Sequence, residues 1–113
     1  MAEDIEPNAP EGAAVFPLIP PELGVHPLLL AVLHAMVFLL GSEDDLVNQE
    51  VAGEAADYMA GYLQRLGGAD LERVRVDLNV LAAYARRAKW AKREIQFLKS
   101  FLDDCGVGNK REA

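Results

Sequence analysis

Apolar residues fill one stretch of the chain almost without interruption, from Leu28 to Leu40. Pro27 precedes the stretch and Gly41 follows it, and these residue types favour the first position and the end of an α-helix. We therefore expect a helix over 27–41 that is apolar on every side and covered all round. The run is shorter than the about 20 apolar residues that a membrane span needs, so we expect no span.

Farther along, apolar positions recur at spacings of three and four, which predicts an amphipathic helix with one buried stripe. Ser42 can cap the start of this helix, and Gly67 and Gly68 can end it. The predicted stripe consists of Val47, Val51, Ala55, Tyr58, Tyr62 and Leu66, with Met59 and Leu63 beside them.

The third segment, 69–104, contains neither glycine nor proline and is rich in residues that favour helices. It predicts one helix of about 50 Å at 1.5 Å per residue. The apolar residues of its two halves lie on different sides of the helix, so each half needs its own partner. The sequence thus predicts an all-α fold, a three-helix bundle with a long C-terminal helix.

Residues 1–25 differ from the rest, because their prolines and glycines are too closely spaced for a helix or a central strand. We expect an extended, acidic, Pro-rich N-terminal arm, and the sequence is consistent with a docked arm and with a mobile one. The other two expected parts are a helical bundle domain over 26–104 and a flexible C-terminal tail over 105–113.

Charge is divided unevenly along the chain, whose net charge is −7. Residues 1–68 hold eleven acidic residues and one basic residue, whereas residues 69–113 hold seven acidic and ten basic residues. The two ends of one molecule could therefore attract each other, or each end could attract the opposite end of a second copy. The single cysteine and the acidic N-terminal residues, which do not resemble a secretion signal, favour the cytoplasm.

Apolar side chains outnumber the positions that a lone three-helix bundle can cover. We expect self-association as a twofold homodimer through the second half of the third helix. The alternative is a kink in that helix, with the N-terminal arm covering its aromatic residues within one chain. The predicted self-association residues are Trp90, Phe97, Leu98, Phe101 and Leu102.

A cluster of cations, called the basic ridge here, is the only strongly positive region of the chain. It has three interpretations: a solvated face, a contact with an acidic protein surface, and binding to nucleic-acid phosphates. The overall acidity and the lack of a nucleic-acid-binding motif make nucleic acid the weaker partner. The basic ridge consists of Arg86, Arg87, Lys89, Lys92 and Arg93.

Residues that could support catalysis or metal binding do not form a recognisable set. His26 and His34 are too far apart to share a metal on one helix, and no phosphate loop or nucleophile motif is present. We expect no enzyme activity, catalytic residue, metal or cofactor. The sequence favours a protein–protein interaction or assembly module; the alternatives are a nucleic-acid-associated regulator and a bundle that binds an apolar ligand between the first helix and the aromatic residues of the third.

Overall fold

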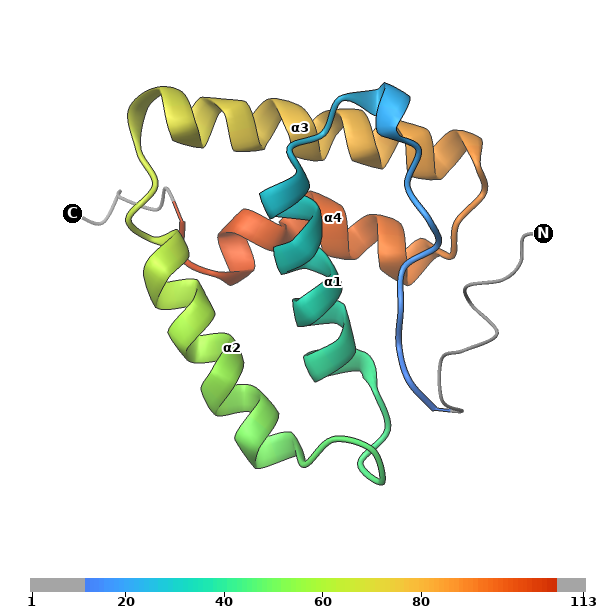
Figure 1. Cartoon of the computed structure of the whole chain (residues 1–113), viewed down its shortest axis with the longest axis vertical. Helices are drawn as coiled ribbons and strands as arrows, with labels where there is room; N and C mark the ends of the chain where they lie inside the picture. Colours follow the sequence, from blue (N-terminus) through green and yellow to red (C-terminus); the bar gives the residue numbers. More distant parts are fainter. Residues whose placement is uncertain (1–11, 108–113) are drawn as a thin grey trace.

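The protein, seen in a computed structural model that describes residues 12–107, consists of two antiparallel helix pairs that cross each other (Figure 1). The first pair is α1 with α2, and the second is α3 with α4 (Figure 1). No helix within the described range is both long and apolar enough to cross a bilayer. The helices are α1 (Pro27–Gly41), α2 (Gln49–Leu63), α3 (Gly68–Arg87) and α4 (Lys92–Asp104), and a 3-10 turn, η2, spans Pro21–Leu23.

The all-α prediction is confirmed, but the predicted long third helix is wrong, because α3 and α4 are separate helices. The chain reverses at Lys89, whose φ is +63°. The Lys89 N–H donates to the Arg86 carbonyl at 3.2 Å, and the Trp90 N–H donates to the Ala85 carbonyl at 2.9 Å. This pair of bonds is the Schellman motif, which ends a helix at a left-handed residue.

Burial explains why the chain turns back despite the unfavourable conformation of Lys89. A left-handed non-glycine residue costs roughly 1–2 kcal/mol. The reversal lets Leu98 and Phe101 of α4 pack into the core with 1% exposure each. Each such burial contributes about 1.5–3 kcal/mol, so the two together outweigh the cost of the turn.

Replacing Lys89 by glycine is expected to raise the free energy of unfolding by about 0.5–1 kcal/mol, because glycine adopts positive φ without a Cβ clash. Chemical denaturation measures the change. Gly24→Ala is the converse control, since Gly24 has φ +74° with open space around a new Cβ, and it should lower stability. A Lys89→Gly variant less stable than wild type would contradict the left-handed turn.

Part of the predicted N-terminal arm packs on the bundle. Phe16 is buried, and the extended segment that carries it passes the start of α4 (Figure 1), so that its ring contacts His34 of α1 and Phe97 of α4. The start of the predicted C-terminal tail is also packed, since Cys105 and Val107 are buried. Residues 1–11 of the arm and 108–113 of the tail lie outside the described residues.

The first helix has the predicted bounds, and the His26 side chain caps it by accepting the Leu28 N–H at 3.1 Å. The expectation that α1 is covered all round is wrong. Leu29, Leu33 and Met36 are buried, whereas Leu28, Phe38 and Leu40 are exposed. A uniformly apolar sequence therefore did not require uniform burial.

The second helix starts later than predicted. Asn48 caps it, with its Oδ1 accepting the N–H groups of Glu50 at 2.9 Å and Val51 at 3.0 Å. Ser42, the predicted cap, is buried instead, and its Oγ accepts the Ala14 N–H at 2.9 Å. Ser42 therefore fastens the arm to the end of α1 rather than starting α2.

Candidate interaction surfaces

The predicted self-association residues lie largely inside their own chain. Leu98 and Phe101 are buried, and Trp90, Phe97 and Leu102 are partly buried against the same core. The kink in the predicted third helix and the docked arm give them this cover, which is the alternative weighed from the sequence. The assumption that one chain cannot cover these side chains therefore does not hold.

The arm completes this aromatic cluster through Phe16. Its ring centroid lies 5.2 Å from that of Trp90 and 5.9 Å from that of Phe97. The Phe97 and Phe101 rings are also in edge contact, with centroids 5.5 Å apart. Offset and edge contacts of this kind are the favourable arrangements for aromatic rings in a core.

An exposed row of apolar and aromatic side chains on α2 is called the α2 face here. Val51, Tyr58 and Tyr62 are 63%, 74% and 64% exposed, and Ala55 lies between them on the same side. Spacings of four, three and four residues align these side chains along the helix. Val51, Tyr58 and Tyr62 belong to the predicted stripe of α2, and for them the prediction of burial is wrong. The stripe members Met59, Leu63 and Leu66 do pack against the core.

Small residues explain why α2 buries a different side. Ala52 and Ala56 are buried, and Met59 and Leu63 pack partly against the core. Small side chains let two helix backbones approach closely, so α1 meets the alanine side of α2 and leaves the tyrosine side outside.

Acidic side chains follow one edge of the α2 face. Glu50, Glu54 and Asp57, called the acidic row here, recur at four and three residues, and all three are exposed. Arg65 lies beside the face, and its guanidinium is 5.0 Å from the centroid of the Tyr62 ring. The exposed side of α2 thus combines aromatic groups with negative charge.

The five residues of the basic ridge are exposed around the turn between α3 and α4. Arg86 and Arg87 end α3, Lys89 forms the turn, and Lys92 and Arg93 begin α4. They form a cluster at one end of a helix pair instead of a line along one helix, because the predicted helix is broken between them.

A cleft of about 510 Å³, called the α3–α4 cleft here, is lined by residues of α3 and α4. Arg75 and Arg86 of α3 and Lys99 of α4 line it, with Asn79 and Asp103. None of its three cations forms an ion pair within residues 12–107. The sequence did not predict that Lys99 lies opposite Arg75, because this arrangement requires α4 to fold back against α3. The apolar lining consists of Leu78, Ala82, Leu98, Leu102 and Val107.

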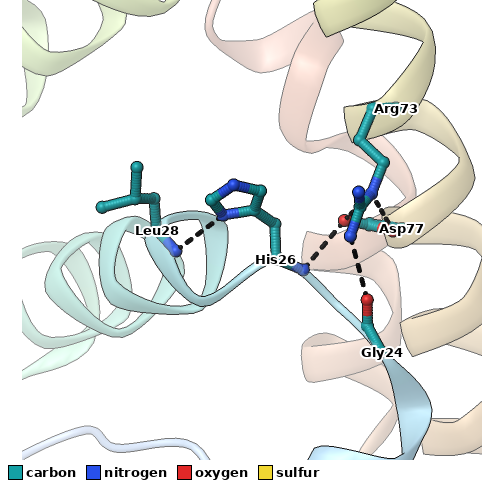
Figure 2. Close-up of polar contacts among 5 residues, drawn as sticks. All are labelled: Gly24, His26, Leu28, Arg73 and Asp77. Carbon is teal, nitrogen blue, oxygen red and sulfur yellow. Dashed lines mark hydrogen bonds and ion pairs between the residues drawn. The ribbon is translucent and has the colours of Figure 1, made fainter.

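A buried carboxylate joins the start of α1 to α3. Asp77 is 5% exposed and accepts the His26 N–H at 2.9 Å, while the Arg73 Nε lies 3.0 and 2.9 Å from its two carboxylate oxygens (Figure 2). Arg73 also donates to the Gly24 carbonyl at 3.0 Å (Figure 2). These bonds occupy both oxygens of Asp77, so we assign the group a structural role.

Two groups with potential for chemistry lie apart and without a catalytic environment. Burial lowers the pKa of His34, whose ring meets the edge of Phe16 at 5.4 Å between centroids. Burial, and secondarily the negative charge of Asp104, raises the pKa of the Cys105 thiol, which makes this thiol a poor nucleophile at neutral pH. Across the described part of the chain, no three His, Cys, Asp or Glu residues gather in a way that could hold a metal ion.

The lowered pKa of His34 makes stability depend on pH. The unfolded chain takes up a proton on His34 near its ordinary pKa of 6.5, before the folded chain does. The free energy of unfolding should therefore fall as pH drops below 6.5, by at most about 1.4 kcal/mol per unit for one proton. Denaturation between pH 8 and pH 5 measures this slope as the difference between wild type and His34→Gln. An identical pH profile for the two proteins would contradict the prediction.

A hollow of about 380 Å³ lies between the arm, α1 and α4, with Phe16, Met36, Leu40 and Phe97 in its lining. It occupies the region in which the sequence places an apolar ligand, although Arg93 and Glu94 also line it. Its location agrees with that alternative, but no observation identifies a ligand.

No family model, curated protein or solved structure matches this chain in the three comparisons made. The functional argument therefore depends on the surfaces described above.

Proposed function

We propose that this protein is a non-enzymatic helical interaction module whose contact surface is the α2 face. The observation that carries the proposal is the exposure of Tyr58 and Tyr62 on one side of α2, together with Val51. Tyrosine supplies a large contact area and a polar hydroxyl, and it is enriched among the residues that dominate binding energy in protein interfaces. An aligned row of such side chains is the arrangement used when two helices pack together.

The partner proposed for the α2 face is a helix with an apolar side edged by lysine or arginine. Its apolar side would cover Tyr58 and Tyr62, and its cations would lie against the acidic row. Complementary charge at the edge of an apolar contact selects the partner and its orientation more than it adds affinity.

Self-association through the aromatic residues of α4 is the less favourable contact. Leu98 and Phe101 would have to leave the core to reach another molecule, and their burial contributes about 1.5–3 kcal/mol each. We therefore place the contact on α2, where no such rearrangement is needed.

Nucleic-acid binding by the basic ridge is a second candidate, supported by the five exposed cations around the α3–α4 turn. Phosphate contacts of this kind give salt-dependent, sequence-independent affinity. The net charge of −7 opposes this candidate, because a polyanion is repelled by most of the molecule.

Binding of a fluorescent synthetic helix of leucine and lysine, followed by anisotropy, tests the α2 face. Tyr58→Ala combined with Tyr62→Ala should weaken binding at least about tenfold, since exposed aromatic anchors carry much of such an interface. Leu18→Ala is the matched control, because Leu18 is 70% exposed but lies on the arm. A matching helix of leucine and glutamate should bind poorly.

Equal weakening by the tyrosine variant and by Leu18→Ala would remove the α2 face from the proposal. Circular dichroism shows whether each variant keeps its helices. The tyrosine variant should keep them, because both side chains project from the bundle.

A further inference from the structure

The α3–α4 cleft complements the α2 face in shape and in charge. The cleft is hollow and positive, whereas the α2 face projects and has an acidic edge. Arg75, Asn79, Ala82 and Arg86 follow one another along α3 at spacings of four, three and four residues. The α2 face has the same spacing, with bulky side chains at its third and fourth positions. In the cleft the two middle positions are the short Asn79 and Ala82, which leave room between two arginines for a large side chain.

The cations of the cleft are available for a partner. Arg75, Arg86 and Lys99 are exposed, and the ion pair found in the described range involves other residues. Asp103 is the one acidic residue in the lining, so the cleft is positive in a chain that is negative overall. A complementary occupant has an apolar centre and acidic residues beside it.

We infer that the α3–α4 cleft receives the α2 face of a second copy of this chain, so that two copies exchange these contacts reciprocally and form a closed dimer. The inference rests on the proposed function and names its partner. Tyr58 of one copy lies over the short residues of the other copy's cleft, and the acidic row faces the arginines. A twofold arrangement makes both contacts at once and leaves neither surface open.

The α2 face cannot occupy the cleft of its own chain. Residues of α3 and α4, with Val107, line the cleft, whereas α2 packs its alanine side against α1. Among residues 12–107 neither the tyrosine row nor the cleft is covered, and a second copy supplies a surface to each.

Two complementary variants test the exchange, with molar mass measured by sedimentation equilibrium at increasing protein concentration. The face variant combines Tyr58→Ala with Tyr62→Ala, and the cleft variant combines Arg75→Glu with Arg86→Glu. Wild type should dimerise, and each variant alone should associate at least about tenfold more weakly, because both of its contacts are damaged.

Mixing the two variants provides the decisive measurement. A mixed pair keeps one intact contact, between the α2 face of the cleft variant and the cleft of the face variant, so it should associate more strongly than either variant alone. As a control for surface changes elsewhere, Leu18→Ala is added to the cleft variant, and this protein is mixed with the face variant. The mixture should associate as strongly as the mixture without Leu18→Ala.

Three outcomes would overturn the inference: a monomeric wild type, a cleft variant that dimerises like wild type, and a mixture that associates no better than its components. The second outcome would indicate a contact between two α2 faces. None of these outcomes decides the proposed function, because binding of the leucine–lysine helix by wild type, and its loss in the face variant, is measured separately.

Discussion

Replacing Phe101 by alanine is expected to lower the free energy of unfolding by about 3–5 kcal/mol, the usual cost of removing a fully buried phenylalanine side chain. Phe101 is 1% exposed and packs edge-on against Phe97 within the core. The surrounding helices cannot close the space completely, so the cost includes a cavity as well as lost burial. Chemical denaturation followed by the fluorescence of Trp90, the one tryptophan of the chain, measures the change.

Two further variants show whether this loss comes from the core. Phe101→Leu keeps most of the volume and should cost less than Phe101→Ala. Tyr58→Ala removes an exposed aromatic side chain and should change stability by no more than about 0.5 kcal/mol. A Phe101→Ala protein of nearly unchanged stability but reduced molar mass would place Phe101 in an intermolecular contact instead.

Replacing Asp77 by alanine is expected to cost about 3 kcal/mol, because it removes the acceptor of the His26 N–H and of the Arg73 Nε and leaves Arg73 only its bond to the Gly24 carbonyl. Losing one member of a buried pair commonly costs 3–5 kcal/mol, and we expect a value near the lower limit, since Arg73 is 51% exposed and water can solvate it. The free energy of unfolding from denaturant titration gives the magnitude.

Asp77→Asn and Glu72→Ala separate the causes of this loss. Asp77→Asn keeps one acceptor oxygen but removes the charge, so it should fall between wild type and Asp77→Ala. Glu72 is exposed on the same helix, and Glu72→Ala should have little effect. If the Asp77→Ala and Glu72→Ala proteins had the same free energy of unfolding, the hydrogen bonds that connect α1 to α3 would contribute nothing to stability.

Sequence reasoning located both ends of α1, which have local signals. Pro27 and Gly41 fix the bounds of α1 because their backbone preferences act within one or two residues. The end of α3 has no such signal, since Lys89 replaces the glycine that usually occupies a left-handed position. The reversal there is stabilised by contacts distant in sequence, so residues 69–104 were predicted as one helix.

The candidate site was missed for a related reason. Helical periodicity shows that the α2 segment has an apolar row through Tyr58 and Tyr62, but an alanine row through Ala52 and Ala56 lies beside it. Periodicity cannot choose between adjacent rows. The choice depends on how closely α1 can approach, which is a property of the packed helices.

The position of Phe16 has a consequence for the order in which the molecule can form. Synthesis delivers this residue early, yet two of its ring partners, Trp90 and Phe97, follow only after nearly the whole helical region has been made. Contacts so distant in sequence form late and slow the approach to the native state. A nascent chain that ends before residue 90 therefore lacks Trp90 and Phe97, and of the three ring contacts of Phe16 it can form only the one with His34.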